Sequence, residues 1–427
     1  MWSEEQNTII HSKTDVKQII AAAGSGKTAI MVGMLVEKQK NEGFTPEKIL
    51  VVTFTKKATR EFKERCIKHS ISKKVHISTF HSFCYFLLKQ FHPYFQNRKF
   101  KLLSENKKWQ VTKEILYPYR YKIGGLPFSI LTKNQNEVLK NISASIVVDY
   151  EKKLNSFKDV NAYFEFEDLP FRLLEYLDSN PNQNIFSMFS ELIIDEFQDT
   201  DLTQMQIIQK LKFQKITVVG DDWQAIYGFR GADPKQFLEF STYFPHSQKL
   251  FLSTNYRSLK SVIKTSILSL QKNKNQIHKK IKHSRIGKTI VKKIYVSSAK
   301  ENLLSKFQYF AEKDPNLKIL VRSNFRKREW FKMGIPEKYV QTIHSAKGLE
   351  YETVLVDLVS GWSRDTKKTN IEEERRILYV ALSRAKDNLV LLLNERAKQD
   401  TLLSEFVGYF SIAQTIRNLA LRLLRFW

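Results

Sequence analysis

The fold of this chain is decided by a stretch near its beginning, which reads Lys17-Gln18-Ile19-Ile20 and then Ala21-Ala22-Ala23-Gly24-Ser25-Gly26-Lys27-Thr28. The first four residues end in the apolar pair Ile19-Ile20 and form a short run of the kind found in buried parallel strands. Apolar residues at helical spacing, such as Ile30, Met31 and Met34, follow the glycine-rich stretch. A strand, a glycine-rich turn and a helix therefore follow one another, which is the context in which such a turn binds phosphate.

The residues of the turn predict which atoms would contact the phosphates. Gly24 and Gly26 allow the backbone N–H groups from Gly24 through Thr28 to approach a β-phosphate closely. Lys27 would neutralise β- and γ-phosphate oxygens, Thr28 would place its hydroxyl on Mg²⁺, and the helix N-terminus adds partial positive charge. Ala21 stands where the general pattern has its first glycine, which is a mild departure. The turn predicts a site for a nucleotide and Mg²⁺.

Short apolar runs that end in a polar or glycine-containing turn recur along the chain. An early set comprises Lys17-Gln18-Ile19-Ile20, Ile49-Leu50-Val51-Val52, Leu192-Ile193-Ile194 and Ile216-Thr217-Val218-Val219. A later set comprises Leu250-Phe251-Leu252, Ile319-Leu320-Val321, Val354-Leu355-Val356 and Leu389-Val390-Leu391-Leu392. Helix-length segments separate many of these runs, so we predict an α/β fold with two domains, each built on a parallel sheet.

One of these strands delivers two carboxylates to a sheet edge, in Leu192-Ile193-Ile194-Asp195-Glu196. Asp195 suits Mg²⁺ through a bound water, and Glu196 suits the polarisation of a water that attacks the γ-phosphorus. Two adjacent acids could instead begin a solvated loop, although the phosphate-binding turn weakens that alternative. The two motifs together predict a nucleoside triphosphatase.

Further motifs follow these acids in a fixed order. The first two are Asp195-Glu196-Phe197-Gln198-Asp199-Thr200 and Gly220-Asp221-Asp222-Trp223-Gln224-Ala225-Ile226-Tyr227-Gly228-Phe229-Arg230-Gly231-Ala232. They resemble the UvrD/Rep-like superfamily 1 DNA helicases, and the Asp-Asp-Trp-Gln variant is similar to the helicase IV branch. Other segments that fit the resemblance are Thr53-Phe54-Thr55-Lys56-Lys57-Ala58, Thr79-Phe80-His81-Ser82, Asn255-Tyr256-Arg257-Ser258, Thr342 to Glu350, and Glu373 to Lys386.

The resemblance implies two RecA-like motor domains that hold ATP between them. The second domain would supply Arg257 and Arg384 to the γ-phosphate, where an arginine finger contributes roughly 10³–10⁵ in rate. Gln224 would link the γ-phosphate to the nucleic-acid side. Arg384 could instead form a surface ion pair, an alternative that the sequence leaves open.

The resemblance also implies the contacts to the rest of the nucleotide. Gln6 would read adenine, Tyr256 would stack on the adenine ring, and Glu350 would contact the ribose. Ser3-Glu4-Glu5-Gln6 also reads as an ordinary helix start, so Gln6 has a second interpretation.

A motor that moves on any sequence needs aromatic rings, because every base has a face on which to stack. By resemblance, the stacking residues are Phe54, Tyr227 and Phe229, and the phosphate contacts are Thr55, Lys56, Thr79, Arg230 and His344. Phe229 stands where many relatives carry Trp, and Lys56 stands where many carry Asn. Phe54 follows a buried strand and could belong to the core instead.

The composition agrees with a nucleic-acid partner. The chain has 427 residues, and 70 Lys+Arg against 44 Asp+Glu leave a formal charge of +26, which favours a polyanion. No apolar run reaches about 18 residues, and the first residues lack the pattern of a signal peptide, so we expect a cytoplasmic protein. Cys66 and Cys84 are too few for a disulfide framework, and structural zinc is not expected.

We expect five segments: a first RecA-like domain at 1–85 and 165–248, an accessory insertion at 86–164, a second RecA-like domain at 249–400, and a helical tail at 401–427. The sequence does not indicate the fold of the insertion. Residues 272–293 carry nine Lys/Arg and read either as a solvated connector or as a phosphate-contacting patch. The tail has an amphipathic stripe that would pack on the motor or dock a partner.

The expected function is an ATP-dependent DNA translocase or helicase that moves on single-stranded DNA, with 3′ to 5′ polarity implied by the family alone. The span from Arg257 to Thr342 leaves little room for a second accessory domain. The sequence therefore leaves open whether this chain separates duplex DNA. The alternative is a DNA-stimulated ATPase switch within a larger repair or defence assembly. The tail has no nuclease-like acidic cluster, so any nuclease would be a separate polypeptide. A small-molecule kinase would not need the motifs of the second domain.

Overall fold

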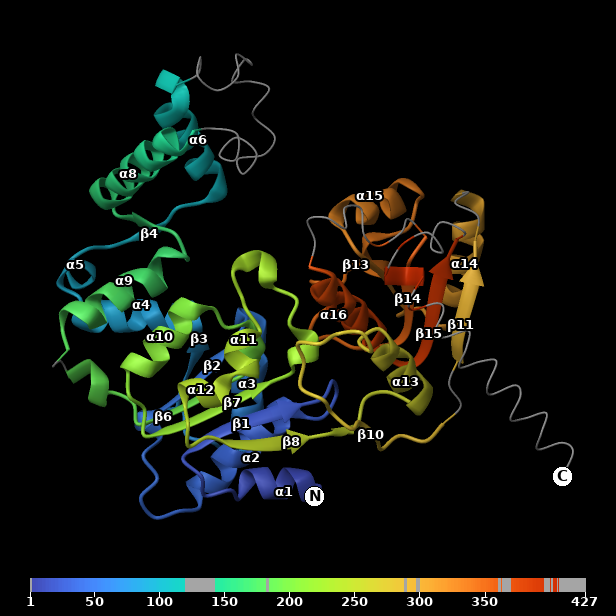
Figure 1. The fold of residues 1–427 in the computed structure, drawn as a ribbon, viewed down its shortest axis with the longest axis horizontal. Helices are drawn as coiled ribbons and strands as arrows, with labels where there is room; N and C mark the ends of the chain where they lie inside the picture. Colours follow the sequence, from blue (N-terminus) through green and yellow to red (C-terminus); the bar gives the residue numbers. More distant parts are fainter. Residues whose placement is uncertain are drawn as a thin grey trace, which may run out of the picture. The chain divides into compact units, whose positions relative to one another are not determined.

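The computed structural model describes residues 2–119, 143–181, 184–287, 290–296, 300–359, 362, 370–394, 400, 402–404 and 406 (Figure 1). The chain divides into two compact units. One unit comprises residues 1–77, 189–202 and 213–427, and the other comprises residues 78–188 and 203–212. Within the described residues, no helix is both long and apolar enough to cross a membrane.

The first sheet has six strands in the order β3-β2-β6-β7-β1-β8. Their bounds are β1 Val16–Ala21, β2 Ile49–Thr53, β3 His76–Thr79, β6 Glu191–Ile194, β7 Lys215–Gly220 and β8 Gln248–Leu252. Strand β1 pairs in parallel with β7 and β8, and β6 pairs in parallel with β2 and β7. Strands β1, β2, β6 and β7 are buried over most of their length, as expected for a parallel sheet that is covered on both faces.

Helices cover this sheet through apolar side chains. One core cluster joins Ile9, Ile30 and Phe62 of three helices to strand residues such as Ile19 and Val51. The helices of this part are α1 Glu4–Ile10, α2 Lys27–Gln39, α3 Lys56–Lys68, α11 Lys235–Leu238 and α12 Phe240–Tyr243. Short 3-10 helices are η1 Pro46–Lys48, η5 Phe197–Asp199, η6 Asp222–Gln224 and η7 Gly228–Arg230.

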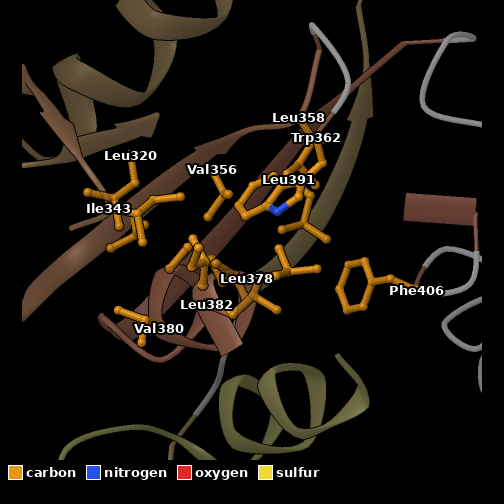
Figure 2. Close-up of a cluster of buried hydrophobic side chains, with 14 of the residues drawn as sticks. Leu320, Ile343, Val356, Leu358, Trp362, Leu378, Val380, Leu382, Leu391 and Phe406 are labelled. Atoms are coloured by element: carbon orange, nitrogen blue, oxygen red, sulfur yellow. The ribbon is translucent and has the colours of Figure 1, made fainter. Parts of the chain in front are cut away.

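The second sheet has five strands in the order β11-β15-β14-β12-β13, and its neighbouring strands are parallel. Their bounds are β11 Ile290–Tyr295, β12 Lys318–Val321, β13 Val340–Thr342, β14 Tyr351–Asp357 and β15 Ala385–Leu393. The associated helices are α13 Lys260–Leu268, α14 Lys300–Lys313, α15 Asn324–Lys332, η8 Glu337–Tyr339 and α16 Ile371–Leu382. Figure 2 shows α16 residues such as Leu378 and Leu382 packed with Val356 and Leu391 of the sheet. The prediction of an α/β fold with two parallel sheets is confirmed.

One predicted strand was assigned to the wrong sheet. The run at residues 250–252 lies in β8 and pairs with β1, so it is the edge strand of the first sheet. Its apolar composition identifies a strand but carries no information about the neighbour with which the strand pairs. The strand that follows it is short: β9 Thr254–Asn255 pairs with β10 Lys282–His283.

The second compact unit is mainly helical. Its elements are α4 Phe80–Phe91, α5 Pro93–Gln96, β4 Lys101–Leu102, α6 Glu105–Leu116, η2 Tyr117–Tyr119, α8 Ala144–Asn161, β5 Tyr163–Phe164, α9 Asp168–Ser179, η4 Asn184–Ser187 and α10 Leu202–Lys210. A separate core cluster joins Val111 and Leu116 of α6 to Ile146, Tyr150 and Leu154 of α8. The predicted tail stripe at residues 412–426 lies outside the described residues.

Candidate nucleotide and nucleic-acid site

The glycine-rich turn between β1 and α2 has a backbone shape that requires its glycines. Gly24 and Gly26 have φ angles of +66° and +89°, in the left-handed region that other residues rarely adopt. A Cβ on Gly24 would lie 2.5 Å from Cβ of Arg257, and a Cβ on Gly26 would lie 3.2 Å from Nε2 of Gln6. The turn therefore needs glycine both for its dihedral angles and for its close neighbours.

Lysine and the strand-end acids lie together next to this turn. Nζ of Lys27 is 3.0 Å from Oε1 of Glu196. Burial would raise the pKa of Glu196, but the charges of Lys27 and Lys347 outweigh burial and lower that pKa. Burial, together with the charge of Glu196, raises the pKa of Asp195. The strand end thus offers one firmly ionised carboxylate and a second whose ionised form a nearby cation would stabilise.

A chain of buried hydrogen bonds runs from Glu196 to Arg384. Nε2 of Gln198 donates to Oε2 of Glu196 at 2.6 Å, and Oε1 of Gln198 accepts from the N–H of Asp221 at 2.8 Å. Nε2 of Gln224 donates to Oδ2 of Asp221 at 2.6 Å, and Oε1 of Gln224 accepts from Nη2 of Arg384 at 2.9 Å. One polar network therefore connects the end of β6, the 3-10 helix η6 and the residues that follow α16.

Arg384 is a buried residue, so it does not form the surface ion pair that the sequence left open. Its side chain is 1% exposed. Nε donates to the carbonyl of Val380 at 3.0 Å, and Nη1 donates to the carbonyl of Leu349 at 3.2 Å. Burial and the nearby charge of Arg257 lower the pKa of Arg384 to about 9, so the guanidinium is still charged at neutral pH.

Tyr256, Arg257 and Glu350 form another part of the site. Nε of Arg257 donates to Oε2 of Glu350 at 2.6 Å, and Lys386 lies 3.4 Å from the other oxygen of that carboxylate. The N–H of Tyr256 donates to the carbonyl of Gly24 at 2.9 Å, while the residue is 39% exposed. The Tyr256 ring is thus available for stacking beside the phosphate-binding turn.

A cavity of about 700 Å³ lies between these groups, within the usual size range of small-molecule sites. The predicted site residues that line it are Gly24, Ser25, Gly26, Lys27, Thr28, Phe54, Thr55, Asp195, Glu196, Gln224, Tyr227, Tyr256, Arg257, Glu350 and Arg384. Gln6 is buried, with its side-chain nitrogen near Gly26, and also forms a reciprocal helix cap with Ser3. Both interpretations of Gln6 therefore fit the structure.

The predicted stacking residues form an aromatic group beside the cavity. The rings of Phe54 and Tyr227 stack at 4.9 Å with an interplanar angle of 24°. Phe229 is 66% exposed, and its ring lies 5.3 Å from that of His344. The guanidinium of Arg230 lies over both Tyr227 and Phe229, at 5.3 and 5.5 Å. Phe54 is only half-buried, which argues against the alternative that it belongs to the core.

Three further predicted phosphate contacts lie at helix starts. The hydroxyl of Thr55 caps α3 by accepting from the N–H of Ala58 at 3.1 Å, and Lys56 is the first residue of that helix. Thr79 caps α4 in the same manner and belongs to the second compact unit. Helix N-termini suit anions because their first N–H groups lack intrahelical partners.

Two functional-site residues were missed at the sequence level. Nζ of Lys347 lies 2.5 Å from Oδ2 of Asp199 and donates to the carbonyl of Gln224 at 2.7 Å, and it also lies 4.9 Å from the ring centre of Tyr227. Gln198 links Glu196 to Asp221, as described above. Gln198 lies in the motif from Asp195 to Thr200, and Lys347 lies in the motif from Thr342 to Glu350. No local pattern of sequence shows that Gln198 bonds to Asp221 or that Lys347 bonds to Asp199 and Gln224.

One lysine of the basic segment 272–293 is not solvated. The side chain of Lys279 is 1% exposed and lies 2.7 Å from Oδ1 of Asp222, and it also contacts Asp221. The connector interpretation is therefore wrong for Lys279. A phosphate contact does not describe it either, because its partners are carboxylates.

The fold and the site define a class of α/β protein in which residues that follow the strands of two parallel sheets line one cavity of the size of a nucleotide site. The family model of the UvrD/REP helicase N-terminal domain matches residues 2–245, and that of the UvrD-like helicase C-terminal domain matches residues 331–396. The first match covers more than half of the chain, so the protein belongs to the UvrD/REP helicase family.

The chain is similar to three curated relatives named ATP-dependent DNA helicase PcrA. It is 31% identical to that of Bacillus subtilis over 286 residues, 28% identical to that of Staphylococcus epidermidis over 286 residues, and 29% identical to that of Staphylococcus aureus over 283 residues. These matches cover 60%, 61% and 61% of this chain but only 38% of each relative.

Proposed function

We propose that the chain is an ATP-dependent DNA translocase or helicase motor that hydrolyses ATP and moves on single-stranded DNA. The observation that carries the proposal is the unbroken polar path from Lys27 and Glu196 to Arg384, whose two ends line one cavity together with Gln224. Such a path lets the state of one γ-phosphate act on both sheets. The family and the names of the relatives support the same activity.

In this proposal each residue acts on a defined part of the nucleotide. Lys27 and the N–H groups from Gly24 through Thr28 hold the phosphates. Glu196, whose pKa is lowered by its lysine neighbours, orients the attacking water. Arg257 and Arg384 stabilise charge on the γ-phosphate.

The outer part of the site would hold the adenosine. Tyr256 stacks on adenine, Gln6 reads its edge, and Glu350 contacts the ribose. Glu350 is paired with Arg257, so nucleotide entry would redistribute this ion pair.

The residues present fit a magnesium ion carried by the nucleotide. Thr28 and Asp195 line the same cavity, and the raised pKa of Asp195 is the kind that a cation would reverse. Within the described residues, no cluster of three His, Cys, Asp or Glu side chains is placed to hold a metal by itself. Thr28 and Asp195 could supply one or two protein oxygens to a Mg²⁺ held mainly by phosphates, where the ion would neutralise phosphate charge.

The DNA strand would run over the aromatic group. Phe54, Tyr227 and Phe229 stack on bases, while Arg230 and His344 contact phosphates, together with the helix start at Thr55 and Lys56. Thr79 belongs to the second compact unit, and its phosphate contact is a separate part of the proposal. Lys347 joins the aromatic group to the backbone of Gln224 and so supports coupling between DNA and ATP. We retain 3′ to 5′ polarity and the likeness to the helicase IV branch as parts of this proposal. We also retain the division into two RecA-like domains, an insertion and a tail, with residues 250–252 moved to the first domain.

A second candidate is a DNA-stimulated ATPase switch within a larger repair or defence complex that does not unwind by itself. The observation that favours it is the internal span between Arg257 and Thr342, where the elements from α13 to β13 leave little room for a second accessory domain. A separate nuclease or repair protein would then be the partner.

The test is ATP hydrolysis with and without single-stranded DNA. We expect many-fold stimulation by DNA, and we expect Glu196→Gln to abolish hydrolysis while ATP still binds. Glu337→Gln is a matched control, because that side chain is 78% exposed. Equal rates with and without DNA would contradict the motor. Strand displacement on 3′- and 5′-tailed duplexes then separates the candidates, since stimulation without displacement favours the switch.

A further inference from the structure

Lys279 is a buried cation behind the nucleotide site. It follows α13 and precedes β10, and its side chain is 1% exposed. Nζ contacts both Asp221 and Asp222, whose side chains are fully buried, and lies 3.3 Å from the carbonyl oxygen of Ala21. The amine also lies 4.6 Å from the ring centre of Trp223. A lysine this deeply buried must be held by its partners, because an unpaired buried charge is costly.

The partners of Lys279 are the residues that hold Gln224. Oδ1 of Asp221 faces Lys279, whereas Oδ2 accepts from Nε2 of Gln224 at 2.6 Å. Gln224 in turn accepts from Arg384 at 2.9 Å. The two oxygens of one carboxylate are therefore divided between Lys279 and the glutamine that meets the arginine.

The residues around Lys279 also connect it to the phosphate-binding turn. Trp223, which its amine faces, packs edge-on against Tyr379 of α16 at 5.6 Å. Ala23 of the turn lies in the same buried cluster as Trp223 and Tyr379. The lysine thus touches the end of β1, the helix η6 and the aromatic contact that reaches α16.

We propose that Lys279 is a positioning residue that orients Asp221, and through it Gln224, so that Gln224 presents its amide oxygen to Arg384. Without the lysine, Asp221 and Asp222 are two adjacent buried carboxylates that repel each other. Asp221 then turns away from its place, and Gln224 loses the acceptor that fixes its amide. This change does not remove a contact of the nucleotide-binding residues Lys27 and Tyr256. Loss of Lys279 therefore lowers the turnover number kcat rather than the affinity for ATP.

The catalytic test rests on the proposed function and compares Lys279→Met with Lys280→Met. Lys280 is the neighbouring lysine and is exposed, so it is a matched control for loss of charge. We expect Lys279→Met to lower kcat for ATP in the presence of single-stranded DNA by about 10- to 100-fold, because a small misplacement of a catalytic group can cost that much. We expect KM for ATP to change by less than about threefold. A kcat equal to that of Lys280→Met would overturn the inference.

A second test needs no activity and so separates this inference from the proposed function. The losses in Tm caused by Lys279→Met, by Gln224→Met and by the double variant form a mutant cycle. We expect the decrease in Tm of the double variant to be smaller than the sum of the decreases in the two single variants. The reason is that Gln224 already lacks its fixed hydrogen bond to Asp221 when Lys279 is replaced. Additive losses would overturn the inference, whether or not the wild-type chain hydrolyses ATP. If Lys279→Met does not fold, the double variant Lys279→Gln with Asp222→Asn replaces it, because this variant removes one charge of each sign. The kinetic measurement and the Tm cycle are then made with that variant.

Discussion

Nη2 of Arg384 donates a hydrogen bond of 2.9 Å to Oε1 of Gln224, between residues that are 160 positions apart in the sequence. Arg384 follows the helix that packs on the second sheet, while Gln224 lies just beyond the end of β7 in the first sheet. A single contact therefore ties the arginine that would stabilise the γ-phosphate to the loop that carries Tyr227 and Phe229. The predictions below follow from this connection.

Replacement of Arg384 by lysine should abolish most catalysis. Lysine keeps the charge but cannot donate to Gln224, Val380 and Leu349 at once, as the guanidinium does. We expect kcat for ATP to fall by about 10³-fold or more, with ATP binding largely retained. Steady-state hydrolysis and nucleotide binding measure the two effects. Arg328→Lys on α15 is the control, because Arg328 is exposed and should behave as wild type.

Removal of the exposed ring of Phe229 should weaken binding of single-stranded DNA. Base stacking contributes about 1–3 kcal/mol per base, which corresponds to about 5- to 150-fold in Kd. Fluorescence anisotropy with a labelled oligonucleotide measures the loss for Phe229→Ala. Phe325→Ala is the matched control, since Phe325 is 48% exposed on α15. An unchanged Kd for Phe229→Ala would remove this ring from the DNA path.

Salt dependence offers a separate check on the DNA site. Each phosphate neutralised on a single strand contributes about 0.7 to the slope of log affinity against log salt. We expect Arg230→Ala to reduce that slope by about this amount, whereas Phe229→Ala should leave it unchanged because a ring carries no charge. Equal slopes for wild type and Arg230→Ala would show that Arg230 makes no phosphate contact.

The loop that carries these residues is also held from α16. Oε1 of Glu373 accepts from the N–H of Gly228 at 2.9 Å, and a Cβ on Gly228 would lie 2.8 Å from the other carboxylate oxygen. Glu373→Ala should therefore reduce stimulation of ATP hydrolysis by DNA more than it reduces the rate without DNA. Glu373→Gln keeps an acceptor oxygen and should restore most of the stimulation. The same loss in both variants would contradict a role for this hydrogen bond.

Stability should depend on His344 at mildly acidic pH. Burial, followed by the charge of Arg322, lowers the pKa of His344 from its ordinary 6.5 to about 4, although Glu374 acts in the opposite direction. The unfolded chain therefore binds a proton that the folded chain does not, so stability is full above pH 6.5 and falls as the pH drops toward 4. His344→Gln should flatten the fall in Tm over this range. His246→Gln, at an exposed position, should leave it unchanged.

The sequence allows local features to be predicted and leaves long-range ones unresolved. Gly24, Gly26 and Lys27 could be recognised because a strand, a turn and a helix follow one another within a few residues. The run at residues 250–252 could be recognised as a strand, but its partner β1 lies more than 200 residues away, so it was placed in the wrong sheet. The same reason explains why Lys347 was missed as a site residue and why the burial of Lys279 was not predicted, since their carboxylate partners lie 148 and 58 residues away.

The central claim is that one triphosphate is held jointly by the residues of both sheets. The most direct measurement is an experimental structure of the chain with Mg²⁺ and a nonhydrolysable ATP analogue. We predict that Lys27 and both Arg257 and Arg384 lie within hydrogen-bonding distance, about 3.2 Å or less, of γ-phosphate oxygens. An analogue bound by Lys27 with both arginines still paired only to Glu350 and Gln224 would contradict the account.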